Sequence, residues 1–541
     1  MRWAIVSLLA AAATTATGKR VELNWDIGYL QANPDGLNQR RVIGVNGKWP
    51  PPVIEVDEGD VLAIHAHNSL DEPTSLHAHG FHQRGTTYFD GVPGVTECGI
   101  PPNGNFTYEY SITQTGTYWL HSHYEAQYTD GLRTPLVIHA HKEPHHYDEE
   151  MVVMLEGWYH RNSKDVLQQL LSTSEYVRNL PFRPYMLVNS HGGADLRPTT
   201  LKFKPGKTYR LRLLNVSATG MVRFGIEQHE MHVIEVDGTA TEPKLVNSVQ
   251  LSVGQRVSVL VTAKNTTRAN YVYHADMFTD IQAGVERAVL PYTSIVEYAK
   301  GAPLVNATDK DSTVGWDFFE DVDLVPIDKQ SPPGVNKWVP LEARTAIFDD
   351  RREHLTFNNR TYAKPTVPTL TTALTTGYQA FYPDVYGFKT HPIILDPMTD
   401  IEVAIFNHDN NSHPFHLHGH SFFVYRRGAV NDDPAKVRDA GPYPVRRDTI
   451  TVPPHEFALL RFKADNPGVW LFHCHMAFHA EQGMMATFIE DPYYIKNGTN
   501  LPKEYSDNCK QMGIPLAGNA MGHQGLDLPD EPKGPFPLNK T

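Results

Sequence analysis

One ten-residue pattern occurs twice in the chain, at residues 114–123 and 466–475. Each copy starts with a glycine-containing turn, continues as an aromatic run and ends in His-x-His, as His121 and His123 in the first copy and His473 and His475 in the second. On a β-strand, side chains two residues apart lie on one face, roughly 6.5 to 7 Å from each other. Each copy is therefore expected to present two imidazoles side by side at the end of a strand.

The rest of the chain repeats a β architecture. Short runs rich in Val, Ile, Tyr, Phe and Thr alternate with period two between turn residues, which predicts β-sandwiches or barrels. A turn that leads into an alternating strand occurs three times, at residues 54–67, 203–216 and 395–408. Because the chain has 541 residues and one domain typically has ~150, we predict three tandem β-domains.

The predicted boundaries follow the local composition. Residues 1–18 have a basic start, an apolar run and a small-residue end, which is typical of a secretory signal peptide. The first domain then covers residues 19–145 and the second 146–300, and a Pro- and Asp-rich linker at 301–338 leads to the third domain and C-terminal tail at 339–541. Since the histidine-bearing copies lie in the first and third domains, the second is interpreted as a spacer.

Composition narrows the possible partners. The formal net charge of −13 argues against a nucleic-acid binder. No second apolar run reaches the ~18 residues of a membrane span, so we expect no membrane anchor. With 28 His and only 3 Cys, any metal chemistry depends mainly on imidazole. We expect a secreted glycoprotein, monomeric and located outside the cell or in the cell wall.

Four His-x-His pairs indicate a metal centre. They are His77 with His79, His121 with His123, His416 with His418, and His473 with His475. One such pair is as often structural as functional, but four pairs supply eight nitrogen ligands. Cys474 lies between the last two histidines, and its side chain leaves a strand by the opposite face. It can therefore bind one metal while its two neighbours bind others.

Three further residues have suitable spacing to join Cys474: His413, His479 and Met484. Two His, one Cys and a weakly bound Met are the ligands of a blue-copper electron-transfer site. The alternative for Met484 is a core methionine beside Met485.

With these motifs the sequence resembles the multicopper oxidases, the family of laccases, ascorbate oxidase and the fungal iron-uptake ferroxidases. The likeness runs from about residue 21 to the C-terminal tail. The motifs are Leu76-His77-Ala78-His79-Gly80, Trp119-Leu120-His121-Ser122-His123, His413-Pro414-Phe415-His416-Leu417-His418-Gly419-His420 and His473-Cys474-His475-Met476-Ala477-Phe478-His479. The resemblance implies an all-β fold of three tandem cupredoxin-like Greek-key β-sandwich domains, with four copper ions as cofactors.

The resemblance also divides the ligands among the ions. The type 1 copper would be bound by His413, Cys474 and His479, with Met484 in the axial position. The type 2 copper would be bound by His77 and His416. The type 3 pair would be bound by His79, His121, His123, His418, His473 and His475. Electrons would pass from the type 1 copper through Cys474 to the other three ions, where O2 is reduced to water.

Two acids and two cysteines complete the expectations from the family. An acid eleven residues after the first motif's second His is a candidate proton relay, which here is Asp90, with a plain turn aspartate as the alternative. The family's second acid is missing, because Ala477 occupies its position, so either Glu481 supplies protons or the relay runs mainly through Asp90. Cys98 and Cys509 are expected to form a disulfide that ties the tail to the first domain.

The electron donor that this chain oxidises is harder to predict from the sequence. The chain is most similar to the ferroxidase branch, in which three acids near the type 1 copper bind Fe(II). Asp409 matches one of them, with a turn residue as the alternative, and Asp280, or else Asp276, matches a second. At the third position stands Leu180, with Glu175 as the nearest acid.

Three functions are therefore ranked. An axial Met favours a low-potential copper, and the chain ends without the C-terminal membrane helix of the iron-uptake ferroxidases. The first expectation is thus a secreted laccase-like oxidase that couples oxidation of electron-rich phenolic or aminophenolic substrates, such as pigment or secondary-metabolite precursors, to reduction of O2. The alternatives are a soluble ferroxidase that converts Fe(II) to Fe(III) and a non-catalytic copper-storage protein.

Overall fold

The computed structural model describes residues 18–174, 184–192, 198–279, 288–305 and 319–532, together with 534, 535 and 537. The expected signal peptide lies almost wholly outside the described residues, as do three positions considered for iron binding, Glu175, Leu180 and Asp280.

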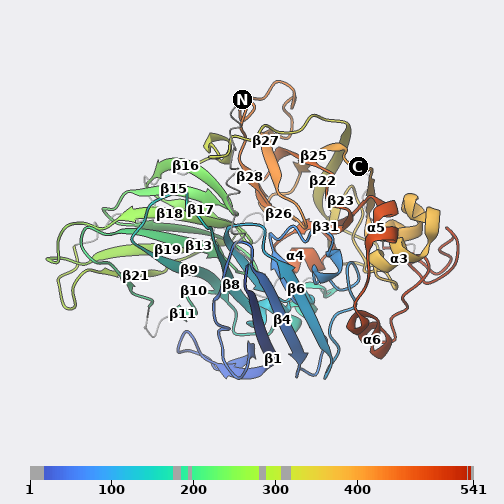
Figure 1. Ribbon diagram of the computed structural model, residues 1–541, viewed down its shortest axis with the longest axis horizontal. Coiled ribbons are helices and arrows are strands. Elements are labelled where there is room, and N and C mark those ends of the chain that lie inside the picture. Colours follow the sequence, from blue (N-terminus) through green and yellow to red (C-terminus); the bar gives the residue numbers. More distant parts are fainter. Residues whose placement is uncertain are drawn as a thin grey trace, which may run out of the picture.

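The strands of the described residues form six sheets, two from each of three consecutive stretches of the chain (Figure 1). The first stretch gives sheet β2-β1-β4-β6, of β1 (Arg20–Ala32), β2 (Arg40–Val45), β4 (Val61–Asn68) and β6 (Asn105–Ser111), and sheet β3-β8-β7-β5, of β3 (Ile54–Asp57), β5 (His77–His79), β7 (Gly116–His121) and β8 (Arg133–His139).

The second stretch, green in Figure 1, gives a seven-stranded and a six-stranded sheet. Their strands are β9 (Glu149–Trp158), β10 (Tyr185–Val188), β11 (His191–Gly192), β12 (Leu201–Lys202), β13 (Thr208–Asn215), β14 (Met221–Ile226), β15 (Met231–Val236), β16 (Thr239–Val246), β17 (Val249–Leu251), β18 (Arg256–Thr262), β19 (Tyr271–Thr279), β20 (Ala288–Leu290) and β21 (Thr293–Glu297).

The third stretch gives sheets β23-β22-β25-β30-β27-β28 and β24-β32-β31-β26-β29. Their strands are β22 (Lys337–Ile347), β23 (Glu353–Phe357), β24 (Pro392–Leu395), β25 (Asp400–Asn407), β26 (His413–Leu417), β27 (Phe422–Ala429), β28 (Arg446–Arg447), β29 (Thr449–Val452), β30 (Glu456–Lys463), β31 (Gly468–Cys474) and β32 (Met485–Glu490). The predicted all-β fold of three sandwiches is confirmed. We propose domain boundaries in the gaps between β8 and β9 and between β21 and β22, near the expected positions.

The three domains share one pattern of strand pairing. The first strand of each domain runs parallel to a later strand, as β1 to β4, β9 to β13 and β22 to β25. A second parallel pair also recurs, as β3 with β8, β12 with β21 and β24 with β32. The three turn-and-strand repeats of the sequence form β4, β13 and β25, so the repeated sequence is one repeated structural unit.

Strand β31 is buried on both faces, which explains its continuous apolar run. Trp470, Phe472 and Cys474 belong to the large core shared by the second and third domains. Val469 and Leu471 belong to a separate core on the other face. Because side chains alternate along a strand, Cys474 and its two neighbouring histidines point in opposite directions.

In the part of the chain that the structure describes, helices are few and lie mainly in the third domain and tail. They are α1 (Ser163–Leu170), α3 (Thr369–Thr375), α4 (Ala477–Glu481), α5 (Pro492–Gly498), α6 (Lys503–Gln511) and the 3-10 turns η1 (Thr87–Phe89), η2 (Gln127–Asp130), η3 (Asp321–Asp323), η4 (Gly377–Phe381), η5 (Pro383–Tyr386) and η6 (Phe388–Thr390). Among the described residues, no helix combines the length and apolar character needed to cross a membrane.

The C-terminal helix α6 is covalently tied to the first domain. Cys98 and Cys509 form a disulfide with an S–S distance of 2.01 Å, which confirms the predicted pairing. Asn508 of α6 also donates a hydrogen bond to the Asn105 carbonyl at 3.0 Å. The tail is therefore held against the first domain, although Cys509 lies 411 residues after Cys98 in the chain.

Candidate metal centre

Eight histidines of the first and third domains meet between those domains. Strands β5, β7, β26 and β31 each end where the two domains meet. The histidines lie in these strands or within two residues of their ends: His77, His79, His121, His123, His416, His418, His473 and His475. The ring centroids of His77 and His416 lie 5.9 Å apart, and those of His121 and His475 lie 5.6 Å apart. We call this arrangement the histidine cage.

The cage divides into groups whose ligand atoms lie within 4.8 Å of one another. They are His77 with His79 and His416, His79 with His121 and His475, and His123 with His418 and His473. The closest approaches are 3.0 Å between His79 Nδ1 and His475 Nε2 and 3.1 Å between His418 Nε2 and His473 Nε2. The second and third groups together contain the six histidines expected for the type 3 pair, and the first joins His77 and His416, expected for type 2, with His79.

The outer ring nitrogens of the cage are anchored by backbone carbonyls. His77 Nδ1 donates a hydrogen bond to the Asp90 carbonyl at 2.7 Å, and His121 Nδ1 donates to the Ser122 carbonyl at 2.9 Å. His416 Nδ1 donates to the Asp448 carbonyl and His473 Nδ1 to the Cys474 carbonyl, both at 2.9 Å. Such bonds fix the ring and leave the other nitrogen free for a metal. Within the described structure, the Nε2 atoms of His77, His121 and His416 are buried without a hydrogen-bond partner.

Burial also favours the neutral form of six cage histidines. It lowers the pKa of His79, His121, His123, His418, His473 and His475 well below the ordinary value. A histidine must be neutral to bind a metal, and imidazole ligands suit copper. Buried ring nitrogens without a hydrogen-bond partner that converge from two domains therefore fit bound copper.

The second predicted site lies on the other face of β31. Cys474 Sγ is 3.6 Å from His413 Nδ1 and 3.8 Å from His479 Nδ1, and the two Nδ1 atoms are 3.2 Å apart. Met484 is fully buried, and its carbonyl accepts a hydrogen bond from the Cys474 amide at 3.0 Å. Burial raises the pKa of the Cys474 thiol, so the thiolate needs a cation such as Cu(II) to form.

Asp90 lies where a proton relay was expected. It follows η1 and is fully buried, and its carboxylate accepts a hydrogen bond from His418 Nδ1 at 2.9 Å. The next residue, Gly91, has φ +79°, and a Cβ there would lie 1.9 Å from the Leu76 carbonyl oxygen. Only glycine permits this turn, which brings Asp90 against the first His-x-His strand.

The missing family acid is replaced by apolar packing. Ala477 is buried in a cluster that includes Trp119, Tyr128 and Phe478. Burial raises the pKa of Glu481, whose charged neighbours are Lys364 and Glu125. The residues that surround Ala477 thus form a hydrophobic wall.

Sequence reasoning missed two buried residues beside the cage. Asp448 Oδ1 accepts a hydrogen bond from His79 Nε2 at 3.1 Å, and Arg256 of the second domain donates to both Asp448 oxygens. Burial alone would raise the pKa of Asp448, but Arg256 and His79 more than offset it and hold that pKa well below the usual range. No His-x-His pattern marks either residue.

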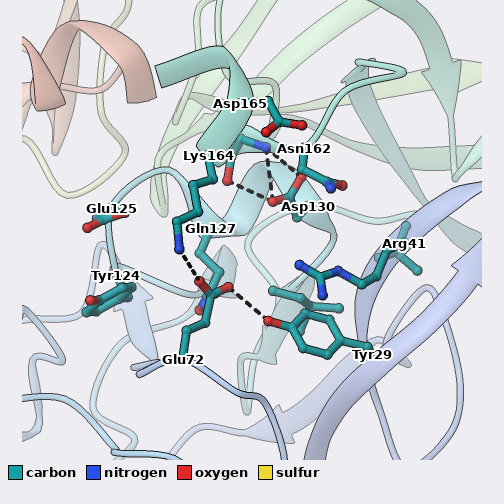
Figure 2. Close-up of a pocket in the computed structure, with 13 residues that line it drawn as sticks. Tyr29, Arg41, Glu72, Tyr124, Glu125, Gln127, Asp130, Asn162, Lys164 and Asp165 are labelled. Atoms are coloured by element: carbon teal, nitrogen blue, oxygen red, sulfur yellow. Dashed lines mark hydrogen bonds and ion pairs between the residues drawn. The ribbon is translucent and has the colours of Figure 1, made fainter. Parts of the chain in front are cut away.

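Gln127, which follows β7 in the chain, lines a small polar pocket (Figure 2). Its volume is about 80 Å³, and Tyr29, Glu72, Gln127 and Lys164 are among the side chains that line it. Gln127 Oε1 accepts a hydrogen bond from Ser122, between His121 and His123, at 2.7 Å. Gln127 in turn donates to Glu72 at 3.3 Å. Gln127, which lines the pocket, therefore helps to hold the segment that carries His121 and His123.

Comparison with known proteins agrees with this geometry. Family profiles described as multicopper oxidase match residues 26–143, 149–295 and 361–493. The chain belongs to the multicopper oxidase family. An iron transport multicopper oxidase of Gibberella zeae is 39% identical over 543 aligned positions, which cover 98% of this chain and 85% of the relative. One of Schizosaccharomyces pombe is 37% identical over 556 positions, which cover 99% and 87%.

Solved structures of multicopper oxidases are also similar. Fet3p, described as a multicopper oxidase that functions in iron import, is 34% identical with a TM-score of 0.87, covering 93% of this chain and 97% of its own. A laccase of Botrytis aclada is 29% identical with a TM-score of 0.79, covering 92% and 93%.

As a multicopper oxidase, the chain is a copper-dependent oxidoreductase that uses O2 as electron acceptor, with one type 1, one type 2 and two type 3 copper ions as cofactors. This membership does not support the copper-storage alternative. We propose that the ligands divide among the ions as the sequence predicted, because the second and third groups contain the six predicted type 3 histidines and the first brings His77 and His416 together.

Proposed function

We propose that this multicopper oxidase oxidises Fe(II) to Fe(III) and passes the electrons to O2. Relatives that align with nearly the whole chain are named iron transport multicopper oxidases. The comparisons therefore favour the ferroxidase alternative over the phenol oxidase that the sequence analysis ranked first. The observation that carries the proposal is a carboxylate beside the type 1 histidines.

That carboxylate is Asp409, in the loop between β25 and β26. Its Oδ2 accepts a hydrogen bond from His413 Nε2 at 3.1 Å and another from the Thr345 hydroxyl. Its side chain is 11% exposed, so one edge reaches solvent. Burial would raise the pKa of Asp409, but His413 and Thr345 more than offset it and lower the pKa to about 2. Asp409 is therefore an anion at neutral pH, which suits a hard cation such as Fe(II).

The other acids considered for iron give no support of their own. Asp276 is 1% exposed and accepts a hydrogen bond from the Tyr292 amide at 3.3 Å, inside the second domain. Such a residue does not face a surface substrate. Of the two candidate acids that the structure describes, Asp409 and Asp276, only Asp409 therefore supports iron binding.

The residues around the type 1 site suggest how the reaction is organised. Copper held by His413, Cys474, His479 and the histidine cage would supply one-electron chemistry that joins a one-electron donor to the four-electron reduction of O2. Asp409 would hold Fe(II) next to His413, whose Nε2 it contacts, while the His413 Nδ1 faces Cys474. Cys474 is bonded through the chain to His473 and His475, so a short covalent path leads into the cage. The Asp90 carboxylate contacts His418. From this position it would relay the protons that water formation consumes.

The test is oxygen consumption by the copper-loaded enzyme with Fe(II), an aminophenol and a diphenol. We expect Fe(II) to give the highest kcat/KM. Asp409→Asn keeps an acceptor for the His413 N–H but removes the charge, so it should lower kcat/KM for Fe(II) by about tenfold or more and change the diphenol rate less than twofold. Asp507→Asn, on exposed α6, is the matched control.

Two results would overturn the proposal. One is a diphenol or aminophenol turned over faster than Fe(II) by the unmodified enzyme. The other is an Asp409→Asn enzyme whose Fe(II) and diphenol rates fall by the same factor, because that would show a general effect on the type 1 site.

A further inference from the structure

The second domain supplies no histidine to the cage, yet its backbone reaches the cage directly. Gly254, just before β18, has φ +87°, and a Cβ there would lie 3.0 Å from the His475 ring and 3.1 Å from the His79 ring. The domain interpreted as a spacer from sequence is therefore one wall of the cage. Two residues further on, Arg256 is fully buried at the same wall.

Arg256 contacts all three domains. Its Nε donates to the Thr117 carbonyl of the first domain at 2.9 Å, and its Nη1 donates to the Gly254 carbonyl of its own domain at 3.0 Å. Its two terminal nitrogens donate to both oxygens of Asp448 in the third domain, at 2.8 and 2.6 Å. Such a bidentate pair fixes the plane of the carboxylate as well as its position.

Asp448, held in this way, has little freedom beside the ligands. One oxygen accepts hydrogen bonds from His79 Nε2 at 3.1 Å and from the Thr449 hydroxyl at 2.8 Å. The backbone carbonyl of the same residue accepts the His416 Nδ1–H at 2.9 Å. Since His79 Nε2 donates its proton outward, His79 Nδ1 is the nitrogen left to face His475, 3.0 Å away.

The ion pair between Arg256 and Asp448 lies so close to Gly80 that a side chain there would clash with it. A Cβ at Gly80, which has φ +88°, would lie 2.6 Å from Asp448 Oδ2 and 2.7 Å from Arg256 Nη2. The ion pair thus packs against the backbone of the first His-x-His motif.

We propose that Arg256 is a positioning residue for the type 2 and type 3 copper sites: it fixes Asp448, which in turn sets the orientation and tautomer of His79 and the position of His416. The second domain would then contribute to oxygen reduction without binding a metal. This inference rests on the cage alone and holds for either class of electron donor.

The test compares Arg256→Lys with Arg212→Lys in the copper-loaded enzyme. Lysine keeps the positive charge at position 256 but loses the bidentate fork. Arg212 is a matched control, because it is also fully buried in the second domain and also contacts Thr117, but it pairs with Glu150. The readouts are copper per chain during titration with EDTA, the type 2 EPR signal, the type 3 absorption and the type 1 blue absorption.

We expect Arg256→Lys to keep the type 1 absorption while the type 2 and type 3 signals fall, with copper affinity at those sites reduced about 10- to 100-fold. Arg212→Lys should keep all signals. The proposal is overturned if Arg256→Lys retains normal type 2 and type 3 signals, or if both variants lose them equally.

A second variant keeps the proposal testable if Arg256→Lys does not accumulate as folded protein. Asp448→Asn preserves the shape of the carboxylate and removes its charge. Loss of the type 2 and type 3 signals with the type 1 absorption intact would support the proposal. Normal signals in Asp448→Asn would overturn it, because the charge that Arg256 holds would then be unnecessary.

Discussion

The carboxylate of Asp90 accepts a hydrogen bond from His418 Nδ1 at 2.9 Å, although 328 residues separate them in the chain. The acid comes from the first domain and the histidine from the third. A buried carboxylate in contact with a ligand can hold a proton next to the place where oxygen is reduced. Its position predicts a role in proton supply that is independent of the electron donor.

Replacement of Asp90 by Asn should therefore slow turnover with every donor. We expect Asp90→Asn to bind copper and show the type 1 absorption, while oxygen consumption falls about 100-fold. Anaerobic reduction of the type 1 copper by Fe(II), followed by stopped flow, should keep its normal rate. An enzyme slowed only with Fe(II) would argue against the relay.

Replacement of Met484, the proposed axial ligand, should change the driving force for electron transfer from the donor to the type 1 copper. Met484→Leu removes a weak ligand without changing the size of the side chain much, so the reduction potential of the type 1 copper should rise. Simple monophenols should then be oxidised faster. Met485→Leu is the control, because Met485 faces a different core. An unchanged potential in Met484→Leu, measured by redox titration, would show that Met484 is only a core methionine.

One buried acid should make stability depend on pH. Burial raises the pKa of Glu97 from 4.5 to about 8, so the folded protein keeps this proton over a range where the unfolded chain has lost it. Stability should therefore fall as pH rises from about 4.5 to 8, by up to about 1.4 kcal/mol per pH unit from this group.

Glu97→Gln should remove that slope. The amide oxygen of the introduced glutamine still accepts a hydrogen bond from the Tyr108 hydroxyl, which donates to Glu97 at 3.0 Å in the unmodified protein. Thermal unfolding across this pH range is the measurement, with Glu109→Gln on the exposed face of β6 as control. Equal slopes in the unmodified enzyme and Glu97→Gln would contradict the prediction.

The disulfide should protect the tail. The double replacement Cys98→Ser and Cys509→Ser should lower stability by about 2 to 5 kcal/mol. It should also expose α6 to limited proteolysis while the copper signals persist, since the cage lies elsewhere. Reduced, unmodified enzyme should give the same fragments. A protease pattern unaffected by both treatments would show that packing alone holds the tail.

The proposed metal ligands could be predicted from sequence because each His-x-His pair is local. His-x-His on a strand sets two rings on one face, and Cys474 between two such rings must point away from them. The copper sites therefore follow from short motifs together with the family resemblance. The fold followed from alternating strands repeated three times.

Arg256 and the choice of donor could not be predicted in this way. Arg256 and Asp448 are 192 residues apart and meet only because three domains dock. Nothing in the run around Gly254 shows that its backbone will contact His475. The donor depends on surface acids, and a short loop motif such as that of Asp409 serves equally well as a turn.

The cage is completed by residues from both ends of the chain, since His77 and His121 come early and His416 and His475 come late. Neither outer sandwich can hold the three-metal cluster alone, and the middle sandwich must already be docked to close its wall. Full metallation therefore requires that the whole polypeptide has been synthesised and that its domains have docked.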